Sequence, residues 1–140
     1  MSNNKLKSLI NNFQENITEI LSTNSTHTES DTRSEFIDPF FKLLGWDMDN
    51  SSGFSSFNKE VKIENFNSID DEKSQIPDYI FKIKNNKKFI IEAKKVSEDI
   101  NKKKHTFQIR QYGYSAGLPI SAITNFNEIR IFDTSIEPKI

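Results

Sequence analysis

Residues 76–95 read IPDYIFKIKNNKKFIIEAKK, and this stretch decides the fold. Two apolar runs, Tyr79–Ile83 and residues 88–93, lie on either side of Asn85 and Asn86. Asparagine favours tight turns, and isoleucine, phenylalanine and tyrosine favour strands, so the stretch predicts a β-hairpin. The second strand ends in a glutamate-alanine-lysine triplet, and the first strand is preceded by proline-aspartate.

The charged residues at the end of this hairpin are the best candidates for chemistry. Charges beside apolar strands cost free energy unless they are solvated, paired or bound to a metal. Glu92 and Lys94 share one strand face because side chains alternate. Asp78 lies opposite Glu92 only if the pairing is offset by a three-residue loop, residues 84–86, or by a bulge before Asp78. A regular two-residue hairpin would turn Asp78 to the wrong face.

Given that register, we expect a magnesium-dependent nuclease site. Mg²⁺ prefers oxygen ligands and keeps several waters, so Asp78, Glu92 and the backbone carbonyl of Ala93 are the predicted ligands, with Mn²⁺ as a substitute. Lys94 would orient or deprotonate the attacking water and offset the charge that develops on a phosphate. The alternative is a surface ion pair between Lys94 and one of the two acids.

The rest of the chain predicts an α/β fold with a mixed central β-sheet flanked by helices. Apolar residues recur at helical spacing over residues 5–21 and again over residues 36–44. Asp31 or Thr32 is the expected N-cap of the second helix, Pro39 should bend it or open its first turns, and Gly45 should end it.

Further strands are expected at residues 57–63, Ile120–Thr124 and 128–132, with a turn at residues 125–127. Residues 64–75 read as a loop. A helix over residues 104–117 would connect the hairpin to the last two strands, and its Gly113 and Gly117 would let it approach the sheet closely.

Length and composition set the class of protein. With 140 residues the chain suits a single domain, and with no cysteine it has no disulfide or cysteine-ligated zinc, which favours a reducing compartment. No run of eighteen apolar residues and no signal peptide is present, so we expect a cytoplasmic protein with no membrane contact.

Charge is distributed unevenly along the chain. The net charge is −1, but residues 73–104 carry ten lysines against four acidic residues. A basic surface beside carboxylates suits a site that binds a nucleic-acid backbone and cuts it. Solvation of a hairpin and a loop by these lysines is the alternative.

Pro77-Asp78 with Glu92-Ala93-Lys94 resembles the motif of the PD-(D/E)xK nuclease superfamily. Residues 32–50, 77–95 and 108–133 are similar to the N-terminal endonuclease domain of type IIG restriction-modification enzymes. The resemblance implies a restriction-endonuclease-like fold and Mg²⁺-dependent cleavage of double-stranded DNA. It also implies methyltransferase and target-recognition domains in the same or a partner chain, which would supply specificity. Whether two nuclease domains must dimerise to cut both strands is left open by the sequence. Residues 1–140 would be one nuclease domain from a longer enzyme.

The resemblance also assigns accessory residues. Glu35 would complete the metal shell, directly or through water, and Gln108 and Tyr112 match a glutamine-x-x-x-tyrosine pattern found after the lysine in related nucleases. Because they are four residues apart, they would share one helix face, where an amide and a phenol can hydrogen-bond a phosphate or the lysine. The alternatives are that Glu35 is an exposed residue in a helix's first turn and that Tyr112 packs on the sheet. We expect His27 and His105 to be solvated and Trp46 to lie in the core.

Two other functions fit the same residues. One is a non-catalytic DNA-binding or docking module of a restriction complex, although the intact acidic residues and lysine argue against a decayed site. The other is the nuclease domain of a type I ATP-dependent restriction subunit, whose motor would lie elsewhere because this chain has no phosphate-binding glycine loop.

Overall fold

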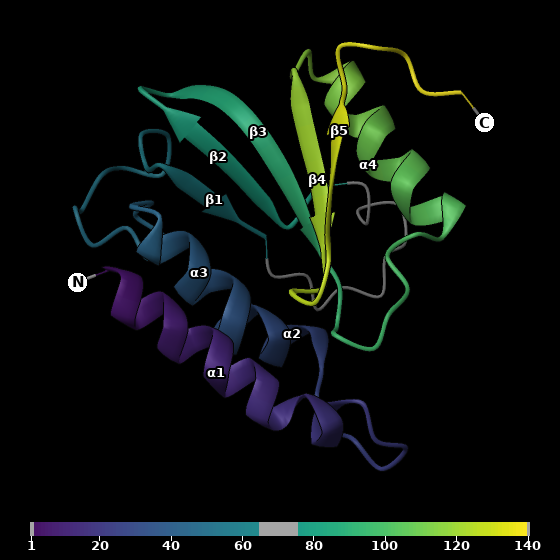
Figure 1. Ribbon diagram of the computed structural model, residues 1–140. Coiled ribbons are helices and arrows are strands. Elements are labelled where there is room, and N and C mark those ends of the chain that lie inside the picture. Colours follow the sequence, from purple (N-terminus) through teal and green to yellow (C-terminus); the bar gives the residue numbers. More distant parts are fainter. Residues whose placement is uncertain (1, 65–75, 140) are drawn as a thin grey trace.

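The computed structural model describes residues 2–64 and 76–139 (Figure 1). Most of the loop predicted at residues 64–75 lies outside the described residues. Among those described, no helix is both long enough and apolar enough to cross a membrane.

The N-terminal part is helical, as predicted. Helix α1 spans Ser2–Ile20, and a second helical segment consists of α2 (Glu29–Thr32), a π-helical turn (Arg33–Ile37) and α3 (Asp38–Leu43).

The second segment begins earlier than expected. Its N-cap is Thr28, whose hydroxyl accepts a hydrogen bond from the Asp31 amide at 3.0 Å, while the Asp31 carboxylate accepts one from the Thr28 amide at 3.0 Å. The prediction of Asp31 or Thr32 as the cap was therefore wrong. Asp31 is the third residue of a capping box that satisfies two backbone donors at once.

Pro39 explains the π-helical turn in the middle of this segment. Proline has no amide hydrogen, so it cannot bond to the Glu35 carbonyl one α-turn earlier. The chain widens instead, and the Asp38 amide donates to the carbonyl of Arg33. The expected opening of the helix next to Pro39 is thus observed, and Gly45, with a φ of 105°, follows the end of α3 as predicted.

A five-stranded mixed sheet forms the centre of the fold, with strand order β1-β2-β3-β4-β5 (Figure 1). The strands are β1 (Val61–Ile63), β2 (Tyr79–Ile83), β3 (Asn86–Ala93), β4 (Ile120–Thr124) and β5 (Ile129–Asp133). Neighbouring strands are antiparallel except β3 and β4, which are parallel and joined through helix α4 (Lys103–Ser115). The predicted α/β class and mixed sheet are confirmed, and the arrangement is consistent with a restriction-endonuclease-like fold. The first strand is shorter than predicted.

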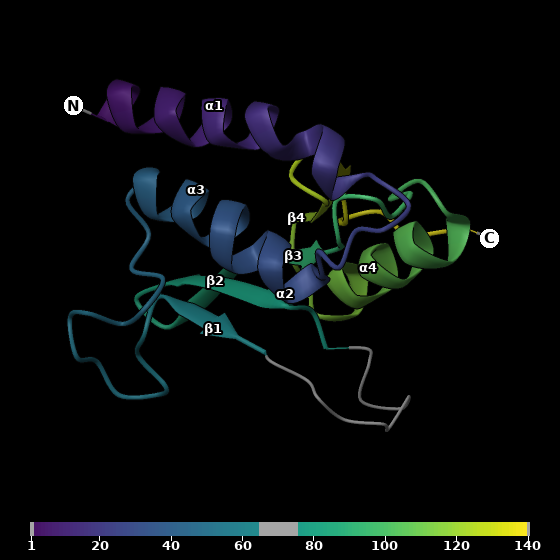
Figure 2. The same ribbon diagram turned by 90° about the horizontal axis from the view of Figure 1, so that it is seen from below.

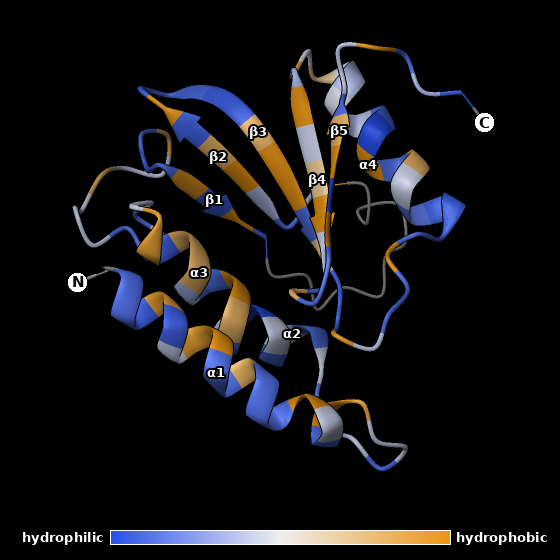
Figure 3. Cartoon of the chain, viewed as in Figure 1, coloured by the Kyte–Doolittle hydropathy of each residue, from blue (hydrophilic) through white to orange (hydrophobic). Residues whose placement is uncertain are grey.

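Helices cover both faces of the sheet (Figure 2). Alternate residues of the hairpin point to opposite sides, so Phe81 and Ile91 pack with Phe41 of α3, whereas Ile90 packs with Ile109 of α4. Helix α1 lies outside α3, and its apolar residues face inward (Figure 3). The hairpin is therefore buried on both faces, which accounts for its nearly continuous apolar sequence.

Two further residues show how tightly the layers pack. Trp46, predicted to lie in the core, places its ring 5.0 Å from that of Phe81 and 5.6 Å from that of Phe89. Gly113 lets α4 approach the sheet as expected, because a Cβ built there would lie 2.1 Å from Ser121 Oγ. Gly117 has no such neighbour within 4 Å, so that part of the prediction was wrong. Its φ of 72° forms the turn after α4 instead.

Candidate functional site

The register of the hairpin brings Asp78 next to Glu92. Tyr79 pairs with Ile91 and Phe81 with Phe89, whereas Lys82 pairs with Lys87, so one extra residue, Lys88, is accommodated in β3 as a bulge. The turn itself has two residues, Lys84 and Asn85, both in the left-handed region with φ of 50° and 66°. The offset that the metal hypothesis requires is therefore present, and a bulge near the turn supplies it rather than a three-residue loop.

Backbone amides hold the two carboxylates at the end of the hairpin. The Asp78 amide donates to Glu92 Oε1 at 3.1 Å, and the Ala93 amide donates to Asp78 Oδ2 at 2.7 Å. Both side chains are largely buried, with 16% exposure for Asp78 and 15% for Glu92. Each carboxylate thus uses one oxygen on the backbone and keeps a second oxygen for another partner.

Ala93 contributes backbone groups to the same edge. The amide and carbonyl of a strand residue point toward the same neighbouring strand. Because the Ala93 amide faces Asp78, and the Lys94 amide bonds to Thr124 on the other side, the Ala93 carbonyl also faces the Asp78 side. Two carboxylates and a carbonyl form an oxygen donor set that a hard divalent cation could use.

Two cationic side chains approach the remaining carboxylate oxygens. Lys94 Nζ lies 3.9 Å from Glu92 Oε2, and Arg33 Nη1 lies 3.5 Å from Asp78 Oδ1. Arg33 also donates to the Tyr79 hydroxyl at 3.1 Å and to the Glu64 carbonyl at 3.1 Å. The Tyr79 hydroxyl in turn donates to Asp38 Oδ1 at 2.5 Å. Arg33 therefore links the helical segment to the strand that begins beside Asp78.

Crowding of acidic groups changes their proton affinity. Burial, together with the nearby charge of Asp78, raises the pKa of Glu92 well above its usual value, and Lys94 only partly offsets this. Burial and Asp78 also raise the pKa of Glu29, which Lys94 and Arg33 lower in part. A bound divalent cation would relieve this repulsion, so the electrostatics fit the donor set.

These side chains line one pocket between β2, β3, α2 and α4. Its lining consists of Glu29, Arg33, Ile76, Asp78, Glu92, Lys94, Lys104, His105 and Gln108. Asp78, Glu92, Lys94 and Gln108 were all predicted from the sequence, and the structure brings them together.

Two predicted accessory residues lie elsewhere. Glu35 lines a different pocket, where its carboxylate is 3.4 Å from His27 Nε2. Glu29 lies two residues before Asp31, one of the two predicted N-caps. It is the glutamate of this helical segment that lines the Asp78 pocket. Tyr112 packs beside the apolar cluster under α4, which is the alternative left open for it.

Sequence reasoning also missed the histidines. His105, expected to be solvated, has a side chain only 11% exposed, and its Nε2 lies 3.0 Å from Glu98 Oε1. His27, with 12% exposure, was likewise expected in solvent. Their burial depends on contacts made at the tertiary level, for which local composition gives no signal. Thr28 and Asp31, three apart, did carry a readable signal, because this spacing is typical of a capping box.

Comparisons with known proteins give one informative match. No protein-family model matches the chain, and no solved structure matches it. The chain is 34% identical over 137 residues to a curated Escherichia coli protein named "Type II restriction enzyme and methyltransferase RM.Eco57I". The match covers 96% of this chain but only 14% of that protein. The chain is thus related to a short part of a type II restriction enzyme and methyltransferase.

Proposed function

We propose that this chain is a Mg²⁺-dependent DNA endonuclease domain of the PD-(D/E)xK type, acting in restriction of foreign double-stranded DNA. The main observation behind this proposal is the position of the Asp78 and Glu92 carboxylates next to each other. Backbone amides hold them there through hydrogen bonds of 2.7 and 3.1 Å, and Lys94 lies beside Glu92. Two fixed carboxylates and one ammonium group at a single strand edge suit phosphodiester hydrolysis better than they suit folding.

The proposed metal ligands are Asp78, Glu92 and the Ala93 carbonyl. Mg²⁺ bound there would supply a Lewis acid for the phosphate and a lowered pKa for water. Glu29 takes the accessory position that the resemblance assigned to Glu35, because it lines the same pocket.

Lys94 has the central role among the protein's own groups. Its ammonium would hold the attacking water and offset the negative charge that develops on the phosphate. In the reaction a water oxygen bonds to phosphorus, one bridging P–O bond breaks, and the departing sugar oxygen takes up a proton. Gln108 and Lys104, on the α4 side of the pocket, would hold the DNA backbone.

The likeness to a fused restriction enzyme and methyltransferase supports the proposed biological role. By this proposal, specificity comes from methyltransferase and target-recognition domains in the same or a partner chain, as in type IIG enzymes. Two nuclease domains would meet to cut both strands of a duplex.

Cleavage of supercoiled plasmid tests the proposal. The chain is incubated with plasmid and Mg²⁺ or Mn²⁺, beside Asp78→Asn, Lys94→Ala and the control Lys95→Ala. Lys95 is the exposed neighbour of Lys94, so its variant removes the same charge without touching the pocket. Metal-dependent nicking should persist in Lys95→Ala and fall by at least about a hundredfold in the other two.

Metal titration by calorimetry separates the remaining outcomes. If nothing is cut but Mg²⁺ binds in a way that depends on Asp78, the metal site exists, and cleavage also requires the proposed methyltransferase and target-recognition domains. If neither cutting nor Asp78-dependent metal binding is seen, the proposal fails and a non-catalytic docking module is the better description.

A further inference from the structure

A second cluster of ligand-type side chains lies away from the Asp78 pocket. His27, Asp31 and Glu35 each place one nitrogen or oxygen within 4.8 Å of the others. They line a pocket together with Glu19 and polar residues of the loop after α1, and within residues 2–64 and 76–139 no lysine or arginine lines it. Three carboxylates therefore share this pocket with a single imidazole.

The hydrogen bonds around His27 determine which ring nitrogen is available. The Thr32 hydroxyl has one hydrogen, which it donates to the Thr28 carbonyl at 3.0 Å. At 3.5 Å from His27 Nδ1, the same hydroxyl can then act only as an acceptor. In the neutral tautomer that satisfies both contacts, His27 carries its hydrogen on Nδ1 and its lone pair is on Nε2.

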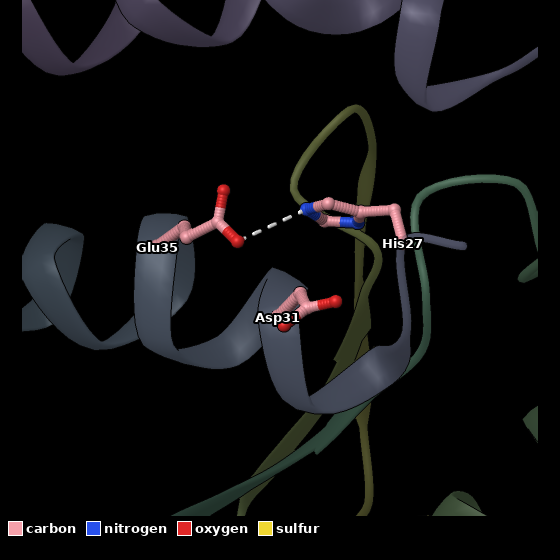
Figure 4. A group of neighbouring side chains, drawn as sticks. All are labelled: His27, Asp31 and Glu35. Carbon is pink, nitrogen blue, oxygen red and sulfur yellow. Dashed lines mark ion pairs between the residues drawn. The ribbon is translucent and has the colours of Figure 1, made fainter. Parts of the chain in front are cut away.

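His27 Nε2 is buried and has no hydrogen-bond partner in the part of the chain that the structure describes. Its nearest charged neighbour is Glu35 Oε2 at 3.4 Å, in a geometry that makes an ion pair only if the imidazole is protonated. In the neutral state a lone pair faces a carboxylate, which is unfavourable unless a cation lies between them. Figure 4 shows the Glu35 carboxylate and the imidazole pointing toward each other, with Asp31 beside them.

We propose that His27, Asp31 and Glu35 form a binding site for a divalent transition metal ion, with Zn²⁺ as the representative. One imidazole and two carboxylates are a donor set typical of Zn²⁺, Co²⁺ or Mn²⁺, whereas Mg²⁺ favours oxygen ligands alone. The contact between the Thr32 hydroxyl and His27 Nδ1 would fix the orientation of the ring. Metal-bound histidines are usually held in this way, by a hydrogen bond to the ring nitrogen that does not bind the metal.

The ligands can close on an ion with small movements. Glu35 is 48% exposed, so its side chain is free to rotate. Asp31 commits one oxygen, Oδ2, to the Thr28 amide and keeps the other for a metal. Hydrogen bonds from Thr28 lower the pKa of Asp31, so this ligand is ionised over the whole neutral range.

The position of the site suggests what it would do. Asp31 and Glu35 are four residues apart, and so are Glu29 and Arg33, which line the Asp78 pocket. A metal held by His27, Asp31 and Glu35 would fix the loop after α1 to the helical segment that supplies Glu29 and Arg33. The proposed ion is thus structural, and its site is independent of the proposed nuclease reaction.

Nuclear magnetic resonance of the imidazole nitrogens tests the site directly. The chain has two histidines, so each ring can be assigned and His105 serves as an internal control. The ¹⁵N-labelled chain is titrated with Zn²⁺. At one equivalent, the ¹⁵N chemical shift of His27 Nε2 should change from that of a nitrogen with a free lone pair to that of a metal-bound nitrogen. An excess of Mg²⁺ should leave it unchanged.

Matched variants identify the carboxylate ligand. Glu35→Gln should weaken Zn²⁺ binding at His27 by about tenfold or more, since even outer-shell changes have effects of that size. Glu15→Gln, an exposed carboxylate on α1, removes the same charge and should have no effect. Both changes are at exposed positions, so we expect both variants to fold like the unmodified chain.

Two results would overturn the proposal. The first is a His27 resonance that responds to pH but not to Zn²⁺, which would describe an ion pair with Glu35. The second is equal Zn²⁺ binding by Glu35→Gln and the unmodified chain. Because Mg²⁺ cleavage and Zn²⁺ binding are measured separately, failure of the nuclease proposal would leave this test unaffected.

Discussion

At the scale of single residues, Arg33 determines how the acidic pocket is supported. Its side chain is 10% exposed, and its guanidinium carbon lies 4.8 Å from the centre of the Tyr79 ring. It donates to Tyr79 and to the Glu64 carbonyl, and its charge faces Asp78. An arginine can make all these contacts because its donors are spread over a planar group, whereas lysine offers a single ammonium.

We therefore expect Arg33→Lys to destabilise the protein by about 1–3 kcal/mol, since buried partners lose their donors. Urea unfolding measures the change. Arg130→Lys on β5 is the control, because Arg130 is exposed; it donates to the Asn101 side chain at 3.0 Å and lies 5.0 Å from the centre of the Phe132 ring. Equal stability of the two variants would contradict the supporting role of Arg33.

Glu92 leads to a prediction on pH. Its pKa is raised, so in the folded protein it holds its proton to higher pH than an ordinary glutamate. Protons compete with a metal for the carboxylate, so Mg²⁺ affinity should fall as pH drops through the raised pKa, and binding should release protons. Calorimetry in two buffers of different ionisation enthalpy measures that release. An identical heat in both buffers would show that Glu92 does not lose a proton on binding.

At the scale of elements, the hairpin turn is strained. Lys84 adopts a φ of 50°, and a non-glycine residue other than asparagine or aspartate rarely occupies this region. The strain is compatible with folding because the flanking strands are held on both faces by the two helical layers.

Replacing Lys84 by asparagine should relieve this strain and stabilise the protein by about 0.5–1 kcal/mol, since asparagine tolerates the left-handed region. Thermal unfolding provides the measurement. Lys87→Asn, at a lysine of β3 that is also exposed, should give no gain. A gain of the same size at Lys87 would point to a charge effect instead.

At the scale of the whole molecule, the lowered pKa values of Asp47 and Glu98 link stability to pH. Hydrogen bonds from Ser51 and Ser52 lower the pKa of Asp47 to about 2, although desolvation opposes this. Contacts with Lys102 and His105 lower the pKa of Glu98 to about 2. A depressed pKa in the folded state stabilises the protein above the unfolded pKa, and this stabilisation is lost as pH falls.

The stability that Asp47 and Glu98 contribute should therefore be lost progressively between about pH 4.5 and pH 2, whereas the raised pKa of Glu92 acts in the opposite direction. The melting temperature measured across this range provides the check. Glu98→Gln should be less stable than the unmodified chain at pH 7, and the difference should shrink toward pH 2. A difference that stays constant with pH would rule out this linkage for Glu98.

Much of the fold can be predicted from local patterns in the amino-acid sequence. The apolar runs of β2 to β4 predicted the sheet because both faces of these strands are buried, and the Asp78–Glu92 pairing followed from strand alternation plus one offset. The bulge itself could not be located, since Lys88 resembles the lysine beside it. The surroundings of His27 and His105, and the fact that Glu29 rather than Glu35 lines the Asp78 pocket, depend on how separate segments pack, which sequence spacing does not encode.

The packing of Trp46 makes the hairpin observable in solution. The chain has a single tryptophan, and its ring touches one phenylalanine from each strand of the hairpin that carries Asp78 and Glu92. Its fluorescence therefore reports whether both strands remain docked against the segment after α3. Separation of the strands would expose the indole to water and shift its emission to longer wavelength. The protein thus contains a native optical probe of the element on which its proposed chemistry depends.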